Sequence, residues 1–227
     1  LYMQAWLLIN LSAASGLAIL LHKQLRWSVR RRTLLQVPLI VLLFFAMLFP
    51  ILATRDKVAD RMSDLAPKTL DGMKYMESSQ YFLDGILMDL GQDYRAILWL
   101  QENVSGSPVI LEAQAFEYYW GNRYTIYTGL PGVVGWNYHQ RQQRAIWANN
   151  AVWDRVESVN QFYTSADQNF VEAYLREYDI GYIIVGQQER IRYAGEGLAK
   201  FEALNEKLWN EVYREHDTVI YQVKKDG

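Results

Sequence analysis

The sequence predicts an α/β protein, in which two N-terminal transmembrane helices precede a three-layer α/β extracytoplasmic domain with a mixed sheet. Two long stretches near the start carry no charge. All 25 acidic residues lie after Thr54, and the later part has a net charge of −7 against −2 for the whole chain. Short apolar runs alternate there with amphipathic segments, which is typical of buried strands and helices. The predicted parts are a helical hairpin over 1–54, an irregular membrane-proximal connector over 55–92 and an α/β domain over 93–227.

The two uncharged stretches, 2–21 and 33–53, each have the length needed to cross a bilayer. A helix rises about 1.5 Å per residue and the hydrocarbon core is about 30 Å thick. The second stretch is strongly apolar, with Pro38 and Pro50 near its ends, where a lost backbone hydrogen bond costs least. The first contains polar and small residues, which is typical of a helix packed among other membrane helices. The alternative is a buried helix of a soluble domain.

The distribution of basic residues predicts the orientation of these spans. The loop 22–32 has five Lys and Arg residues and no acidic residue, whereas 55–61 mixes three basic with two acidic residues. The positive-inside rule then places the loop in the cytoplasm and residues 55–227 outside it, in a multi-pass protein of the cell membrane. Because the chain begins at Leu1 and not at Met, we expect it to be part of a longer polypeptide. Its expected partners are the lipid bilayer and upstream transmembrane helices.

Hydrophobic periodicity and turn residues outline the later domain. Residues 62–91 suggest loops and short turns without a long element. The expected elements that follow are a helix from Asp93 to Val104, a buried strand over 108–113, an alternating strand over 123–129, helices over 138–150, 151–163 and 167–178, a buried strand over 181–186, a helix over 197–208 and a terminal hairpin turning at His216–Asp217.

Several classes of function are excluded by composition. The chain has no cysteine, so it has no disulfide, thiolate metal site or thiol nucleophile. The acidic domain has no basic patch able to neutralise a run of phosphates, so we expect no nucleic acid as a partner. The phosphate-binding G-x-x-x-x-G-K loop, G-x-S-x-G and H-E-x-x-H are all absent.

Candidate binding residues follow the two buried strands, because ligands of open α/β sheets collect beyond the carboxyl ends of the strands. The candidates for substrate binding are Glu112, Glu117, Trp136, His139, Arg144, Glu189, Arg190 and Tyr193. If they converge, they form a polar cleft rich in aromatic rings, which suits sugars and phosphates. The alternative is that the charged residues form surface ion pairs and the rings belong to the core or the membrane interface.

Four segments of the chain carry a resemblance to a known family. These segments are LDGMKYM, AILWLQENVSGSPVILEA, TGLPGVVGWNYHQRQQR and YDIGYIIVGQQERIRYAGEGLAKF. In this order they resemble the C-terminal region of the "YYY" multi-pass membrane proteins of chloroflexi and archaea, a domain of unknown function, over roughly residues 65–205. The family motifs map onto Gly135, Trp136, His139, Gln142 and Arg144, and onto Gly186, Glu189, Arg190 and Tyr193. No roles are established for these positions.

The resemblance implies a large polytopic protein similar to GT-C glycosyltransferases, which take a sugar from a polyprenyl-phosphate donor at the outer membrane face. In such enzymes the acidic catalytic residue lies in an early outer loop, outside this chain. The resemblance therefore assigns no catalytic residue here. The resemblance does not determine whether the protein needs a metal ion. It implies that any divalent ion would be bound mainly by upstream residues.

Two hypotheses for function follow from these observations. In the first, this chain supplies the outer substrate-binding domain of a lipid-linked sugar transferase. In the second, it is a non-catalytic binding or scaffold domain of an envelope membrane protein. A transporter is disfavoured, because neither span contains a charged residue.

Overall fold

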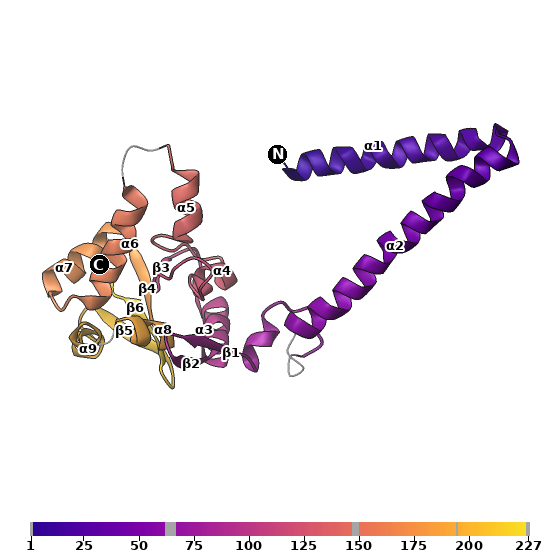
Figure 1. Cartoon of the computed structure of the whole chain (residues 1–227). Helices are drawn as coiled ribbons and strands as arrows, with labels where there is room; N and C mark the ends of the chain where they lie inside the picture. The colour runs from indigo at the N-terminus through magenta and orange to yellow at the C-terminus, as the bar shows by residue number, and fades with distance from the viewer. Residues whose placement is uncertain (1, 62–66, 147–149, 194, 226–227) are drawn as a thin grey trace. The chain divides into compact units, whose positions relative to one another are not determined.

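The computed structural model describes residues 2–61, 67–146, 150–193 and 195–225. The chain divides into two compact units, Leu1–Ser63 and Asp64–Gly227, and each is described by itself. Figure 1 labels their helices and strands.

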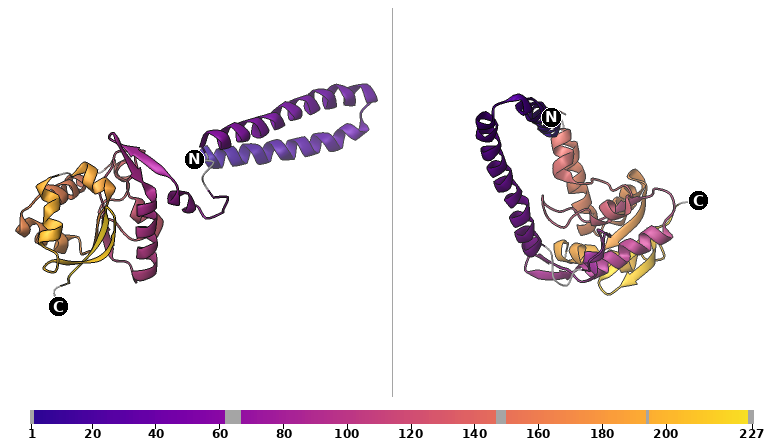
Figure 2. Two further views of the ribbon diagram at one scale, coloured as in Figure 1. Left: turned by 90° about the horizontal axis from the view of Figure 1, so that it is seen from below. Right: turned by 90° about the vertical axis from the view of Figure 1, so that its right-hand side faces the viewer.

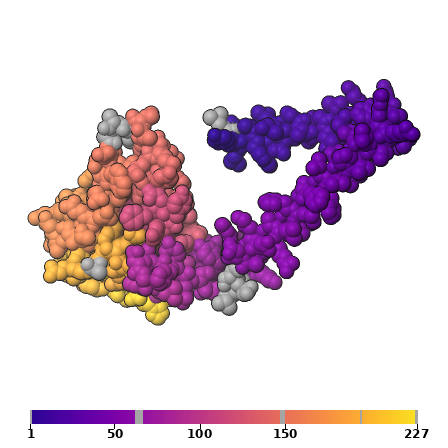
Figure 3. All heavy atoms as spheres, in the orientation of Figure 1, coloured from indigo at the N-terminus to yellow at the C-terminus, as the bar shows by residue number. Residues whose placement is uncertain are grey.

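The first unit consists of two long helices, α1 (Tyr2–Lys23) and α2 (Val29–Arg61), joined by the short helix η1 (Gln24–Arg26). Both long helices are apolar and long enough to cross a membrane, and neither contains a buried residue. Figure 3 shows the atoms of these two helices in indigo and purple. The alternative of a buried helix in a soluble domain does not fit these helices. Contiguous apolar surface of this extent is covered by lipid or by other protein.

The second unit contains a four-stranded mixed sheet in the order β3-β4-β6-β5. Its strands are β3 (Val109–Leu111), β4 (Ile180–Val185), β5 (Trp209–Glu215) and β6 (Thr218–Val223). β3 pairs in parallel with β4, whereas β6 pairs antiparallel with both β4 and β5. The predicted terminal hairpin is confirmed, with its turn at His216–Asp217.

Helices cover both faces of this sheet, as predicted (Figure 2). Ile184 packs with helices α3 (Leu90–Asn103) and α4 (Arg123–Thr128) on one face. Ile183 packs on the other face with residues of α6 (Ala151–Thr164), α7 (Gln168–Glu177) and α9 (Glu196–Ala203). Consecutive residues of a strand point to opposite faces, so a six-residue strand that is buried throughout needs a helical layer on each side. The remaining elements are η2 (Lys74–Glu77), β1 (Gln80–Leu83), β2 (Ile86–Asp89), α5 (Asn137–Gln143) and α8 (Gln187–Arg192).

The prediction of a strand over 123–129 was wrong, because these residues form α4. The carboxylate of Glu112 accepts hydrogen bonds from the backbone N–H groups of Tyr124 and Thr125 in the first turn. A buried acceptor at the N-terminus of a helix satisfies backbone N–H groups that have no partner within the helix. The carboxylate of Glu112 therefore favours a helix over the strand that the alternating pattern predicted.

The connector contains more regular structure than the sequence suggested. Helix α2 continues to Arg61, and β1 and β2 form an antiparallel hairpin. Its turn is Asp84–Gly85, with φ angles of 49° and 86°. An Asp-Gly pair suits a tight hairpin turn in which both central residues have positive φ. Residues 62–66 of the predicted connector lie outside the described residues.

Three helix boundaries also differ from the prediction. Helix α3 begins at Leu90, and its N-cap is Asp89, whose carboxylate accepts the N–H of Gly91. The helix predicted over 138–150 is observed as α5, and residues 147–149 lie outside the described residues. The helix predicted to end at 208 ends at Ala203, and residues 204–208 form a turn that leads into β5 at Trp209.

Candidate functional site

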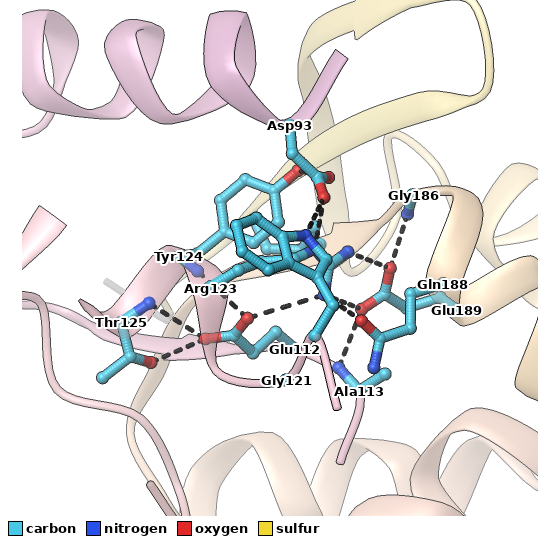
Figure 4. A network of polar contacts seen from close by, with 12 residues as sticks. Asp93, Glu112, Ala113, Gly121, Arg123, Tyr124, Thr125, Gly186, Gln188 and Glu189 are labelled. Atoms are coloured by element: carbon cyan, nitrogen blue, oxygen red, sulfur yellow. Dashed lines mark hydrogen bonds and ion pairs between the residues drawn. The ribbon is translucent and has the colours of Figure 1, made fainter. Parts of the chain in front are cut away.

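Arg123 lies at the centre of a buried polar network (Figure 4). Its Nε donates to Asp93 Oδ2 at 2.8 Å, and its Nη2 donates to Glu189 Oε2 at 2.8 Å. The Oε2 atom of Glu112 lies 3.6 Å from Nη1. The side chain of Arg123 has no solvent exposure, and neither do those of Asp93 and Glu189.

Three elements, β3, α8 and α3, bring these carboxylates together at one edge of the sheet. Glu112 directly follows β3, and Glu189 lies in the first turn of α8, directly after β4. The two strands are parallel, so their carboxyl ends meet at one edge. Asp93 reaches the same point from α3. Glu112 and Glu189 therefore converge at this edge, but they meet in a buried network and not in an open polar cleft.

The environment shifts the pKa values of Glu112 and Glu189 in opposite directions. Burial raises the pKa of Glu112, and neither Arg123 nor the donors of Thr125 and Tyr124 offset this fully. Burial alone would also raise the pKa of Glu189. The charge and hydrogen bonds of Arg123, with the N–H groups of Ala113 and Gly186, hold the pKa of Glu189 below its usual value. The closer guanidinium contact belongs to Glu189, which explains the difference.

The residues of this network are not placed to bind a ligand or to transfer a proton. The guanidinium occupies the place where a cation would otherwise balance three carboxylates, and its carboxylate partners are at most 3% exposed. Among the residues that the structure describes, no group of three or more His, Asp or Glu side chains could hold a metal ion. Groups that no solvent or substrate can reach do not serve as acid or base, so we assign the network a structural role.

A surface pocket of about 300 Å³ lies beside this network. Its walls come from the segment after β3, residues 115–122, and from the start of α5, residues 136–139. Six aromatic side chains line it: Phe116, Tyr118, Tyr119, Trp136, Tyr138 and His139. Tyr118 is 97% exposed and Trp136 is 51% exposed. Glu117, Asn122 and Asn137 add polar groups. The pocket therefore presents exposed ring faces and the carboxylate of Glu117, whereas the side chains of Asn122 and Asn137 are largely buried.

Short contacts hold the two walls of the pocket together. Asn137 Nδ2 donates to the carbonyl oxygen of Ala115 at 3.1 Å. A Cβ at Gly121 would lie 2.6 Å from the Cβ of Ala115, so only glycine permits this approach. Arg141 forms an ion pair with Glu117 from the next turn of α5. The pocket thus has a fixed backbone frame beneath its exposed rings.

The structure distributes the eight candidate residues over several places. Glu117, Trp136 and His139 line the pocket. Glu112 and Glu189 belong to the buried network. The others lie apart from both: Arg144 lines a separate hollow with Trp153, Arg190 donates to the carbonyl oxygen of Asp217, and Tyr193 is buried and stacks on Tyr163 with ring centroids 4.8 Å apart.

Sequence reasoning missed the central residues of the network. Asp93 was predicted only as the first residue of a helix, and the alternative for the charged candidates was ion pairing at the surface. Arg123 does pair with Glu189, but the pair is fully buried. No sequence signal separates a buried arginine from a surface one, because its burial depends on three carboxylates from distant segments.

Comparisons with known proteins give only weak structural similarity. No protein-family model matches the sequence, and no curated protein matches it. The chain is similar to the C-terminal globular domain of an oligosaccharyltransferase from Archaeoglobus fulgidus, with 11% identity and a TM-score of 0.39. The similarity covers 59% of this chain and 97% of that one. A likeness this weak transfers no residue role, and the family resemblance described above stays a prediction from the sequence.

Proposed function

We propose that the globular unit binds a glycan in the aromatic pocket. We further propose that the chain is the C-terminal part of a GT-C-like glycosyltransferase that uses a polyprenyl-phosphate-linked sugar. The observation that carries the binding proposal is the cluster of exposed rings around a hollow that also holds Glu117. The resemblance of residues 65–205 and the two apolar helices support the wider assignment.

The chemistry of the pocket suits hydroxyl-rich rings. Aromatic faces offer flat apolar surface to the C–H face of a sugar, and side-chain carboxylates and amides bond its hydroxyl groups. Among the described residues that line the pocket there is no Lys or Arg, and Arg141 is already paired with Glu117. This favours the sugar over the phosphate of a donor as the occupant.

The test is oligosaccharide binding by the full chain in a neutral detergent. A panel of neutral hexose and N-acetylhexosamine oligosaccharides is titrated against the parent protein and the Trp136→Ala and Phe116→Ala variants. We expect the affinity to fall by about fivefold or more in each variant, since a ring contact contributes about 1 kcal/mol beyond area burial. Phe82→Ala is the matched control, because Phe82 is 67% exposed and Phe116 is 66% exposed. Equal affinity in all four proteins would exclude the pocket as the glycan site.

The second candidate function is a non-catalytic binding or scaffold domain. The buried carboxylates, which are unable to act as acid or base, agree with this function, and they agree equally with a transferase whose catalytic residues lie outside this chain. Sugar transfer by the full-length protein separates the two functions. A substrate-binding domain of a transferase predicts that Trp136→Ala and His139→Ala lower transfer while Phe82→Ala does not. Glycan binding in a full-length protein that transfers no sugar from a polyprenyl-phosphate donor would instead support the scaffold.

A further inference from the structure

A second hollow, of about 370 Å³, opens at the other end of the sheet from the network. It lies where β4 begins and β6 ends, between the later part of α7 and the turn before β5. Because β4 and β6 are antiparallel, the start of one strand lies beside the end of the other. The hollow is therefore part of the globular unit alone and is separate from the aromatic pocket.

The charge of this hollow opposes that of its surroundings. Four basic residues line it, Arg176, Lys207, Lys224 and Lys225, against two acidic residues, Glu172 and Asp179. Residues 55–227 as a whole carry a net charge of −7. A local positive field on an acidic domain attracts anions.

The two carboxylates of the hollow are already paired. Lys225 Nζ lies 2.9 Å from Asp179 Oδ1, and Arg176 Nη1 lies 3.9 Å from Glu172 Oε2. Lys224 donates to the carbonyl oxygen of Glu206, a neutral acceptor that does not balance its charge. Lys207 is exposed and forms no ion pair within the described part of the chain. Within the described residues, the ammonium groups of Lys207 and Lys224 therefore have no carboxylate partner.

The floor of the hollow is apolar. Leu175, Ile180, Leu208 and Val223 lie among its lining residues. The volume falls within the range of ligand pockets, about 300–1,000 Å³. A cationic rim above an apolar floor fits an anionic head group carried on a short length of hydrocarbon better than it fits a bare ion.

We propose that this basic hollow binds a phosphate monoester group, with Lys207 and Lys224 as its cations. Lysine is a compact point charge that suits phosphate without fixed geometry. The group can reach the hollow either as the head of an amphiphile or as free phosphate. Only an amphiphile has carbon atoms next to its phosphate that can contact Leu208 and Val223, and this contact distinguishes it from free phosphate.

The experiment is a phosphorus NMR titration of the full chain in a neutral detergent, with inorganic phosphate and n-hexyl phosphate as probes. Binding of either probe supports the site. Hexyl phosphate binding at least about five times more tightly than inorganic phosphate identifies an amphiphile as the source, because burial of its CH₂ groups against the apolar lining residues adds to the affinity. Equal affinity identifies free phosphate. Absence of binding by both probes overturns the proposal.

Two charge reversals make the test specific. Lys207→Glu should weaken binding by about fivefold or more, because a like charge replaces an opposite one at the rim. Lys68→Glu changes the net charge of the unit by the same amount at an exposed position outside the hollow, and should leave the affinity unchanged. Both residues are exposed, so neither variant disturbs the core. Equal affinities for the two variants would overturn the assignment.

Discussion

Arg123 shows how one buried cation organises a domain. Three carboxylates from α3, from the end of β3 and from α8 meet at its guanidinium. Such a cluster adds little net stability over an apolar replacement of the whole, but loss of one partner leaves uncompensated charge in a medium of low dielectric. The network therefore specifies how these three segments meet more than it stabilises them.

Arg123→Met should lower the free energy of unfolding by about 3–5 kcal/mol at neutral pH, because it leaves buried carboxylates unpaired. Part of this loss should be recovered on acidification. Without Arg123 the carboxylates have folded-state pKa values above their unfolded values, so their protonated forms favour folding at low pH and the stability falls as pH rises. Denaturant unfolding of the full chain in detergent, measured from acid to neutral pH, checks both effects.

Arg214→Met is the control for this variant. Arg214 pairs with Glu202 and Glu211 at the surface, and its side chain is 41% exposed. Screening by solvent leaves such pairs worth at most about 1 kcal/mol. A similar loss in both variants would contradict the special role of Arg123.

The buried residue Lys200 should make the unfolding free energy depend on pH. Its Nζ donates to the carbonyl oxygens of Phe162, Tyr163 and Ser165 at the end of α6. Burial lowers the pKa of Lys200 to about 7, against about 10.4 in the unfolded chain. Between these values the unfolded state binds a proton that the folded state lacks, so the unfolding free energy should rise from pH 7 to pH 9. Lys200→Met should flatten this rise, and an unchanged slope would contradict the assignment.

At the scale of elements, the contact between α9 and α6 depends on a glycine. A Cβ at Gly197 would lie 2.4 Å from the carbonyl oxygen of Tyr163 and 2.5 Å from that of Thr164. Both are backbone atoms, which cannot move aside cheaply. The first turn of α9 can approach the end of α6 only without a side chain, and this approach also brings Lys200 to its carbonyl partners.

Gly197→Ala should therefore destabilise the domain by about 1–3 kcal/mol, the usual cost of overpacking. The measurement is the denaturation midpoint of the full chain in detergent. Gly72→Ala is the matched control, because no atom lies within 4 Å of a Cβ built there. A loss in the control as large as that at Gly197 would show that the cost comes from the glycine substitution itself and not from the contact.

At the scale of the whole molecule, the chain combines an apolar helical unit with an acidic globular one. The side of the membrane on which the globular unit lies is a prediction from the positive loop 22–32. The chain has no cysteine, so a single introduced thiol reports its own location without background.

Ser78→Cys should react with a membrane-impermeant thiol reagent in intact cells, because residue 78 is exposed and belongs to the part predicted to be extracytoplasmic. Leu25→Cys, in the loop between the helices and also exposed, should react only after lysis. Labelling in the reverse order would contradict the predicted topology. Mass spectrometry of the labelled protein gives the readout.

Local periodicity alone determined much of this protein. Uncharged stretches marked both long helices, and continuous apolar runs marked β3 and β4, because hydrocarbon and a doubly covered sheet each select apolar residues locally. The observed ranges of α6, α7 and the terminal hairpin agree with the predicted ranges, because local hydrophobic periodicity also determines these elements.

Only the tertiary structure decided the rest, because burial depends on residues far apart in the chain. Residues 123–129 alternate like a strand, yet the carboxylate of Glu112 caps them as a helix. Arg123 reads as a surface residue until Asp93 and Glu189 enclose it. Of the eight candidates, three line one pocket and two join the buried network. Sequence places residues near the ends of strands, whereas packing decides which of them meet solvent.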